Sequence, residues 1–306
     1  MMLVPKKSLC VFIHFSEYPY IPNYVELYVN ELSIYFDEVI IATNQRALNP
    51  RIESLNANIS IQFLRNEGYD FGMFYKVFQT INPLKYNQIA CVNDSNVLFN
   101  SLQPIFEWGK NSQLDFWGLI DSHEKPWFST HQENYHIQSH FIVFQTKAIK
   151  VLPAFFNSIN IQDIFDEKDI VKLRQAVINQ WEIGLTQFMK NNDILNGCFI
   201  DSQLYSLIHY SGKPVNVGHK LYSELIQSGF PLLKKKIITS SKWTDFFRSE
   251  THWEKMIRQY GNKDWKLEIL INELLQIKDE YNNQPINMLK KQFRKVYNAL
   301  QKKDVA

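Results

Sequence analysis

Gln88-Ile-Ala-Cys-Val92 is an apolar run of strand length, and the polar tripeptide Asn93-Asp94-Ser95 follows it directly. A continuous apolar run that ends at polar residues is typical of a strand buried on both faces of a parallel sheet. Ligands of such sheets bind beyond the carboxyl ends of the strands. Asp94 therefore stands where a carboxylate can hold a metal-bound diphosphate, and this placement indicates an enzyme that uses a nucleotide-activated donor.

Strand-length apolar runs and helix-spaced patterns alternate on both sides of this segment. We expect strands at residues 8–14, 38–43, 59–64, 88–93, 115–120 and 140–145, and helices at residues 22–36, 71–81 and 171–190. This order predicts an α/β fold with a doubly wound, mostly parallel, Rossmann-like sheet. His14, Asn66 and Asp94 all fall at the carboxyl ends of expected strands, so we expect them to meet at one edge of the sheet.

The composition excludes several classes of protein. A chain of 306 residues with 45% hydrophobic and 14% aromatic content can bury a large core. Its 33 basic and 31 acidic residues give no excess charge that would favour nucleic acid. Cys10, Cys91 and Cys198 lie in apolar stretches without zinc-site spacing, which indicates core residues in a reducing compartment. The apolar run that ends at His14 is too short for a signal peptide or a spanning helix, so we expect a cytoplasmic protein.

The chain divides into two expected regions. Residues 1–240 form the catalytic α/β domain, and residues 241–306 form a helical extension with a break at Pro285. Within the extension, residues 286–303 place apolar side chains on one stripe and basic ones around it. This segment either docks on protein or makes a peripheral contact with the anionic inner face of the plasma membrane.

Five motifs occur in an order that resembles the rhamnan synthesis protein F family. They are Leu64-Arg-Asn-Glu-Gly-Tyr-Asp-Phe-Gly72, Val92-Asn-Asp-Ser95, Asp115-Phe-Trp-Gly118, Gln138-Ser-His-Phe141 and Gly229-Phe-Pro-Leu-Leu-Lys234. The resemblance covers roughly residues 8–240. It implies a bacterial glycosyltransferase that moves a sugar, rhamnose or another deoxyhexose, from a nucleotide-diphosphate donor to a cell-surface polysaccharide or a lipid-linked acceptor.

A looser likeness to GT-A transferases of the family 2 type implies roles for single residues. It implies a GT-A-like sheet, a donor turn at Asn66-x-Gly68, a metal signature at Asn93-Asp94-Ser95 and a general base at Glu182. Asp94 would give one oxygen to Mg²⁺ or Mn²⁺. The signature departs from the usual pattern because only one of its residues is acidic, so dependence on the metal stays open.

Glycosyl transfer explains why these residue types are useful. The site must neutralise the departing diphosphate and remove a proton from the acceptor hydroxyl. Asn93 and Ser95 would then bind ribose, phosphate or water. The alternative for Asp94 is a turn or helix cap made by its side chain. One base and one diphosphate site suffice for a single displacement, which favours inversion at the anomeric carbon.

Gly68 and Gly72 flank Tyr69-Asp70-Phe71 just before an expected helix. Backbone amides there would face an anion or sugar hydroxyls. Asp70 either binds the donor or caps the helix. The chain lacks GxGxxG and GxxxxGK[ST] patterns, which disfavours a Rossmann dehydrogenase and a P-loop ATPase.

Glu182 is the preferred general base, and its alternative is a solvated charge on a helix surface. Asp115 and Asp121 bracket an expected strand and are the competing carboxylates.

Several further polar side chains have two interpretations each. His14 lies on the nucleotide side by the family likeness, whereas His123, His131, His136 and His140 lack the spacing of a helical metal pair such as HExxH, which favours surface or hydrogen-bonded histidines. Gln138 and Ser139 would bind sugar hydroxyls or pair a loop with a strand. His219 and residues 234–236 would attract phosphate or form a solvated basic turn.

Two other functions remain open at this point. A noncatalytic carbohydrate-binding or assembly subunit of polysaccharide biosynthesis would explain the single acid in Asn93-Asp94-Ser95. A nucleotidyltransferase would ordinarily carry a basic, glycine-rich loop near its amino terminus, and this sequence has none.

Overall fold

The structure is a computed structural model that describes residues 7–15, 20–45, 55–209, 215–240 and 252–283. All structural statements below concern these residues. The strands are β1 (Lys7–His14), β2 (Glu38–Thr43), β3 (Ile59–Phe63), β4 (Tyr86–Asn93), β5 (Asn96–Leu98), β6 (Phe116–Ser122), β7 (His136–Ile137), β8 (Phe141–Gln145), β9 (Asn196–Ile200) and β10 (Leu232–Lys234).

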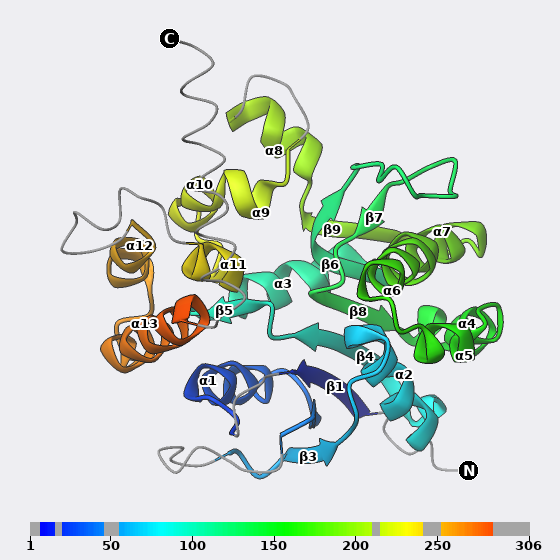
Figure 1. Cartoon of the computed structure of the whole chain (residues 1–306), viewed down its shortest axis with the longest axis horizontal. Coiled ribbons are helices and arrows are strands. Elements are labelled where there is room, and N and C mark those ends of the chain that lie inside the picture. Colours follow the sequence, from blue (N-terminus) through cyan, green and yellow to red (C-terminus); the bar gives the residue numbers. More distant parts are fainter. Residues whose placement is uncertain (1–6, 16–19, 46–54, 210–214, 241–251, 284–306) are drawn as a thin grey trace.

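The helices connect these strands and continue the chain beyond them (Figure 1). The first group is α1 (Asn23–Leu32), α2 (Tyr69–Thr80), the 3₁₀ turn η1 (Pro83–Lys85), α3 (Gln103–Ser112), α4 (Thr146–Asn157), α5 (Ile161–Asp166) and α6 (Ile170–Val177). The second group is the π-helical segment η2 (Ile178–Ile183), α7 (Gly184–Asn191), α8 (Ser202–His209), α9 (Val217–Lys220), α10 (Tyr222–Gln227), α11 (Lys235–Thr239), α12 (His252–Tyr260) and α13 (Leu267–Asn283).

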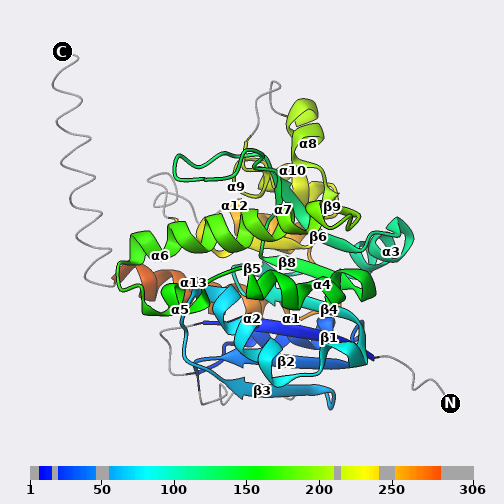
Figure 2. The same ribbon diagram turned by 90° about the vertical axis from the view of Figure 1, so that its right-hand side faces the viewer.

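The central sheet has the strand order β3-β2-β1-β4-β8-β6-β7, and β9 pairs with β6 (Figures 1 and 2). Strand β1 is parallel to both β2 and β4, and β2 is parallel to β3. Strand β8 is antiparallel to both β4 and β6, so β6 runs in the same direction as β4. The expected α/β fold with a mostly parallel sheet is therefore confirmed.

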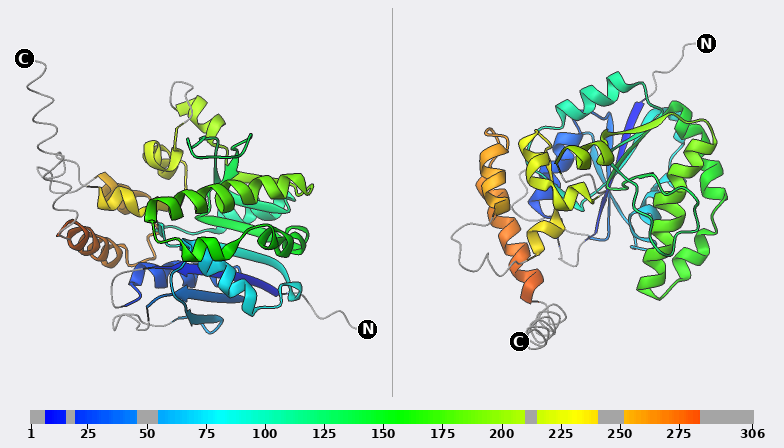
Figure 3. Two further views of the ribbon diagram at one scale, coloured as in Figure 1. Left: turned by 45° about the vertical axis from the view of Figure 1, so that its right-hand side comes forward. Right: turned by 90° about the horizontal axis from the view of Figure 1, so that it is seen from above.

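Helices cover both faces of the sheet, as the view from above shows (Figure 3). Tyr28 and Val29 of α1 pack with the strand residues Phe12 and Val92 on one face. On the other face, α2, α4 and α7 join a second core cluster that contains Val11. The sheet is thus buried on both sides, which explains why its central strands read as continuous apolar runs.

The helices α12 and α13 belong to the first of these cores. Trp253, Ile257, Ile271 and Leu274 are buried in the same cluster as Val25 of α1. The helical character expected after residue 241 is present in residues 252–283, whereas the boundary at 240/241 itself stays a prediction. The basic segment 286–303 lies outside the described residues. No helix within those residues has the length and apolar character needed to cross a membrane.

A small second sheet was not expected from the sequence. Strand β5 directly follows the Asn93-Asp94-Ser95 turn and pairs antiparallel with β10. The pairing register joins Asn96 to Lys234, and the amide of Lys235 donates to the carbonyl of Ser95 at 2.9 Å. This two-stranded sheet therefore fixes two lysines beside the polar turn that follows β4.

Candidate active site

The carboxyl ends of β1 and β4 lie side by side. Ile13 is paired with Asn93, and the amide of Asp94 donates to the carbonyl of Ile13 at 3.1 Å. This register places Asp94 next to His14, the last residue of β1. The expected meeting of these two strand ends is therefore present in the structure.

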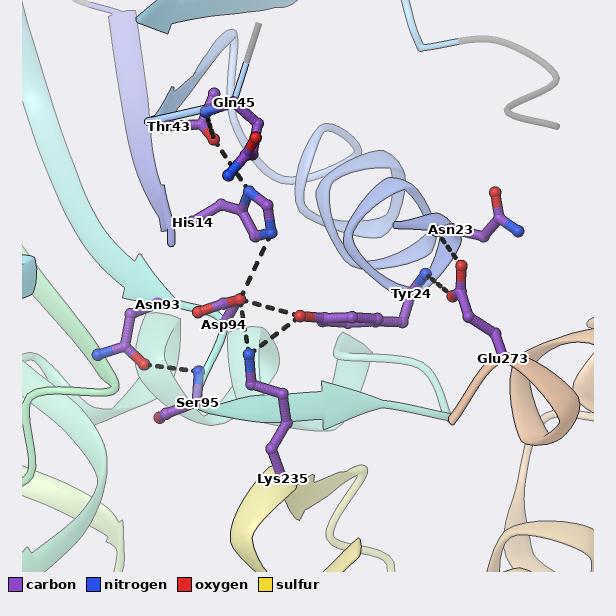
Figure 4. A network of polar contacts seen from close by, with 10 residues as sticks. All are labelled: His14, Asn23, Tyr24, Thr43, Gln45, Asn93, Asp94, Ser95, Lys235 and Glu273. Atoms are coloured by element: carbon purple, nitrogen blue, oxygen red, sulfur yellow. Dashed lines mark hydrogen bonds and ion pairs between the residues drawn. The ribbon is translucent and has the colours of Figure 1, made fainter. Parts of the chain in front are cut away.

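Asp94 is 8% exposed, and its carboxylate is bound by two distant side chains (Figure 4). The ammonium of Lys235 lies 2.7 Å from Oδ2, and the hydroxyl of Tyr24 donates to the same oxygen at 2.9 Å. Lys235 Nζ also lies 3.0 Å from the Tyr24 hydroxyl and 5.2 Å from the centre of its ring. Asp94 is therefore one member of a compact network that joins β4, α1 and α11.

His14 is completely buried beside this network. Its Nδ1 lies 3.0 Å from Thr43 Oγ1, and its Nε2 lies 3.7 Å from Asp94 Oδ2, beyond hydrogen-bonding distance. Burial lowers the pKa of His14 to about 4, although Asp94 acts in the opposite direction. His14 is consequently neutral near pH 7 and leaves Lys235 as the cation that touches Asp94 among the described residues.

Asn93 closes the turn and links it to α2. Its Oδ1 accepts from the amide of Ser95 at 3.0 Å, and its Nδ2 donates to Asp70 Oδ2 at 2.6 Å. The side chain of Ser95 is exposed at the same edge. The turn cap is thus Asn93 rather than Asp94, and the capping alternative for Asp94 does not describe its observed contacts.

The turn before α2 needs both of its glycines. Gly68 has φ +73° and is the N-cap of the helix, a backbone conformation that suits glycine. A Cβ on Gly72 would lie 1.7 Å from the carbonyl oxygen of Glu67, which no side chain could accommodate without a shift of the backbone. Asn66 precedes this turn, and its Oδ1 is buried without a hydrogen-bond partner within the described part of the chain.

Asp70 lies within the first turn of α2, so the interpretation of its side chain as the helix cap is wrong. Protein atoms surround its carboxylate although part of the residue reaches solvent. Burial, together with the charges of Glu182 and Asp94, raises the pKa of Asp70 to about 6. We call Asp70, Asp94 and Glu182 the carboxylate trio, because all three interact electrostatically at this edge of the sheet.

Glu182 lies in the π-helical segment η2, a local widening of the helix that is frequent at functional sites. Trp181 beside it is fully buried and packs edge-to-face on Phe71 at 5.1 Å between ring centres. Glu182 Oε1 accepts from both the amide and the hydroxyl of Ser139, each at 3.1 Å. Glu182 is therefore held in place and half-buried, which contradicts its interpretation as a solvated surface charge.

Gln138 connects the loop before β8 with the second lysine. Its Nε2 donates to the carbonyl of Asp121 at 3.1 Å, and its Oε1 accepts from Lys234 Nζ at 3.0 Å. Burial lowers the pKa of Lys234, although the charge of Glu182 acts in the opposite direction. The solvated basic turn is therefore the wrong interpretation for Lys234 and Lys235, while Lys236 is exposed.

The competing carboxylates have other partners. Asp115 precedes β6 at the opposite end of the sheet, where it forms an ion pair with Lys147 at 3.6 Å. Asp121 is buried at the carboxyl end of β6 and accepts from the amide of Ser202 at 2.7 Å, and burial raises its pKa. Neither residue belongs to the carboxylate trio.

Two of the four clustered histidines, His131 and His136, are hydrogen-bonded, in agreement with the hydrogen-bonded interpretation. His131 Nε2 lies 2.8 Å from the carbonyl of Asn179, and His136 Nδ1 lies 2.7 Å from the carbonyl of Asn134. His140 is buried, and burial lowers its pKa to about 3. The pKa of His219 is lowered to about 4 by burial and then by Lys234 and Lys236.

Glu273 of α13 binds the first turn of α1, the helix that carries Tyr24. Its two carboxylate oxygens accept from the amides of Asn23 and Tyr24, each at 2.9 Å (Figure 4). An acidic group at the first turn of a helix satisfies unpaired amides and complements the helix dipole. The carboxyl-terminal helices therefore hold the helix that presents Tyr24 to Asp94.

Sequence reasoning missed Tyr24 and underrated Lys235. Tyr24 reads only as one of the apolar-stripe residues of its helix, although its hydroxyl reaches the site. The motif that ends at Lys234 signals that this region matters, but the pairing of β5 with β10 decides which lysine meets Asp94.

A divalent cation needs several oxygen ligands, often with more than one from the protein. Asp94 Oδ2 already accepts from an ammonium and a phenol. The described residues contain no group of three or more His, Cys, Asp or Glu side chains arranged to hold a metal ion. As arranged here, the residues around Asp94 do not fit Mg²⁺ or Mn²⁺.

Two cavities lie away from the carboxylate trio. One of about 450 Å³ is lined by residues of α13 and the segment before it, including Trp265 and Leu267. The other, of about 560 Å³, lies at the amino ends of the strands next to Ser8 and Gln88. Since the polar side chains described above are absent from both linings, those side chains rather than these hollows define the candidate site.

The fold and site define an α/β protein with three carboxylates and two lysines at the carboxyl edge of its parallel strands. The chain belongs to the rhamnan synthesis protein F family, whose model matches residues 39–303. This match begins and ends later than the range expected from the motifs, and it includes the helices α12 and α13.

A curated relative is the virulence protein VirA of Vibrio anguillarum, which is 25% identical over 196 residues. The match covers 56% of this chain, and the chain spans 60% of the length of that relative.

Three solved structures are weakly similar to this chain. A putative glucose-1-phosphate thymidylyltransferase from Bacillus anthracis has a TM-score of 0.38 and 8% identity, with 62% of this chain and 86% of that chain covered. The 4-diphosphocytidyl-2C-methyl-D-erythritol synthase from Anaerococcus prevotii has a TM-score of 0.39 and 11% identity, with 69% and 92% covered. The galactosyltransferase LgtC has a TM-score of 0.32 and 12% identity, with 57% and 71% covered. We draw no functional conclusion from these scores.

Proposed function

We propose that the protein is a glycosyltransferase that moves a sugar, rhamnose or another deoxyhexose, from a nucleotide-diphosphate donor to a surface polysaccharide or a lipid-linked acceptor. Membership of the rhamnan synthesis protein F family supports the substrate class. The observation that carries the proposal is the carboxylate trio at the carboxyl edge of the sheet, where ligands of α/β sheets bind.

The reaction needs one base and a site for the leaving group. The bond between the anomeric carbon and the diphosphate oxygen breaks, and its electron pair stays on the diphosphate. The acceptor oxygen bonds to the opposite face of the anomeric carbon, and its proton passes to Glu182. Ser139 holds the Glu182 carboxylate through two hydrogen bonds, so the base is oriented before the acceptor arrives.

The remaining polar residues are proposed to bind the donor. Asn93, Asp94 and Ser95 lie at the end of β4, and His14 is the last residue of β1. Asp70, which follows the turn of Gly68, lies beside Asn93. Gln138 and Ser139 lie on the Glu182 side, where sugar hydroxyls would approach. Asn66 Oδ1 is buried without a hydrogen-bond partner in the described part of the chain. Buried polar atoms are normally hydrogen-bonded, so a bound donor would satisfy this oxygen.

A panel of nucleotide-sugars tests this proposal by thermal shift, with and without Mn²⁺. A donor that binds the folded chain raises its melting temperature by mass action. We expect one donor to shift the melting temperature, and to release its nucleoside diphosphate when a polysaccharide acceptor is added. Asp94→Asn should abolish the shift, whereas Asp279→Asn, an exposed carboxylate on α13, should leave it unchanged. A chain that binds no donor would contradict the proposal.

A noncatalytic carbohydrate-binding or assembly subunit remains the second candidate. It is favoured by the ion pair of Asp94 with Lys235, which uses the only acid of the Asn93-Asp94-Ser95 motif. The same panel separates the two candidates. A subunit of this kind binds the polysaccharide without any nucleotide and releases no nucleoside diphosphate.

A further inference from the structure

Lys235 is positioned by the backbone and not only by its side chain. Its amide donates to the carbonyl of Ser95 at 2.9 Å, and β10 immediately before it pairs with β5. The ammonium therefore reaches Asp94 from a fixed point of the chain. Lys235 also begins α11, so its side chain leaves the turn in a direction different from that of Lys234.

The ammonium of Lys235 is bound and yet partly accessible. It lies 2.7 Å from Asp94 Oδ2, while its side chain keeps 28% of its surface exposed. An ammonium has three N–H donors, so a lysine that contacts one carboxylate and one phenol can still donate to a third acceptor. Tyr24 and Asp94 thus orient the cation without enclosing it.

The ammonium of Lys235 occupies the place beside Asp94 where a metal ion would bind. In a metal-dependent sugar transferase, a carboxylate at this strand end would bind a divalent cation that neutralises the diphosphate. Here the same oxygen of Asp94 binds Lys235. A second cation at that oxygen would be repelled by the ammonium, and no other cluster of acidic or histidine side chains in the described residues offers a metal site.

We propose that Lys235 supplies the positive charge for the donor diphosphate, so that nucleotide binding does not need a divalent cation. This inference rests on the proposed function and deepens it. Asp94 and Tyr24 act as positioning residues that hold the ammonium at the end of β4. The leaving diphosphate is then stabilised by a protein cation that is already in place before the donor binds.

The test measures the binding of UDP, GDP and dTDP by isothermal titration calorimetry, in EDTA and in Mn²⁺. We expect at least one diphosphate to bind in EDTA with an affinity within about threefold of its affinity in Mn²⁺. Lys235→Met should weaken this binding at least tenfold. Lys236→Met removes the same charge from the next, exposed residue, and should change binding less than twofold.

Lys235→Met leaves the Asp94 carboxylate without its cation, so folding is checked by the melting temperature of the unliganded variant. The double variant Asp94→Asn with Lys235→Met removes both charges, and it should fold and still fail to bind the diphosphate. Binding that occurs in Mn²⁺ and is lost in EDTA would overturn the lysine proposal alone, as would a Lys235→Met variant that binds as tightly as the wild type. The absence of binding by all three diphosphates and by every nucleotide-sugar, under both conditions, would instead overturn the proposed function.

Discussion

Asp94 and Glu182 are both held at the carboxyl edge of the sheet, but their partners differ in charge. Asp94 Oδ2 is bound by the ammonium of Lys235 and the hydroxyl of Tyr24. Within the described part of the chain, the hydrogen bonds to Glu182 Oε1 come from the neutral amide and hydroxyl of Ser139. Asp94 is therefore an acceptor for a fixed cation, whereas Glu182 is oriented by the neutral donors of one residue. In the proposed function, Asp94 holds the Lys235 cation that faces the leaving diphosphate, and Glu182 accepts the proton of the acceptor hydroxyl.

The largest expected effect comes from a substitution at Glu182. Glu182→Gln keeps the hydrogen bonds from Ser139 but cannot take a proton, so we expect kcat to fall by about a hundredfold or more. Diphosphate binding should stay within twofold, because the Asp94 side is untouched. Steady-state kinetics and calorimetry measure the two effects, and Glu107→Gln, an exposed residue of α3, is the control. Turnover at the wild-type rate would reject Glu182 as the base.

The next largest expected effect comes from a substitution at Glu273 of α13, which binds the first turn of the helix that carries Tyr24. Glu273→Ala removes the carboxylate that accepts from the amides of Asn23 and Tyr24, and loss of such a cap costs about 1–2 kcal/mol of unfolding free energy. Chemical denaturation measures this loss. Glu280→Ala, whose carboxylate accepts only from Gln276 among the contacts in the described residues, should cost less than half as much. Equal losses in both variants would show that α13 does not stabilise the helix of Tyr24 through this contact.

Asp70 interacts electrostatically with both Glu182 and Asp94, and its raised pKa predicts that the stability of the fold depends on pH. The folded chain holds the Asp70 proton more tightly than the unfolded chain, because burial raises the pKa from 3.8 to about 6. Its stabilising contribution is therefore complete below about pH 4 and is lost as the pH rises through 6. Asp70→Asn removes this loss. The melting temperature of the variant minus that of the wild type should increase between pH 4 and pH 7.

A difference that stays flat or decreases over this range would contradict the raised pKa of Asp70. The three histidines with lowered pKa values change stability in the opposite direction over this range, because they must take up protons on unfolding. They are present in both proteins and largely cancel in the difference, which is why the variant and the wild type are compared at each pH.

The smallest expected effect comes from a substitution at Tyr24, whose hydroxyl donates to Asp94. Tyr24→Phe removes one of the two donors to Asp94 Oδ2, and one hydrogen bond contributes about 1 kcal/mol, which corresponds to roughly fivefold in diphosphate affinity. Tyr86→Phe removes a similar bond from a phenol to Glu38 at the other end of the sheet, at 2.8 Å, and should leave affinity unchanged. If both variants bind as the wild type does, Tyr24 does not position the cation.

Local sequence patterns were sufficient to predict the central strands of the sheet. The apolar runs at residues 8–14, 38–43 and 88–93 correspond to β1, β2 and β4, because strands buried on both faces need apolar side chains at every position. The glycines of the turn before α2 and the polar residues after β4 were also visible, since tight turns and strand ends restrict residue choice. The register of β1 with β4 then brings His14 and Asp94 together.

Contacts between distant segments could not be predicted in the same way. Lys235 reaches Asp94 only because β10 pairs with β5, and Ser139 holds Glu182 across a separation of 43 residues. A lysine looks alike in sequence whether it is solvated or paired, and the difference lies in the partner that the fold brings to it.

The sequence by itself determined the alternation of strands and helices, the turns that need glycine and the family to which the chain belongs. Only the tertiary structure decided which carboxylate meets a cation and which meets neutral donors. The physical reason is that secondary structure depends on neighbours a few residues away, whereas the charge state and partners of a buried side chain depend on atoms contributed by distant parts of the chain.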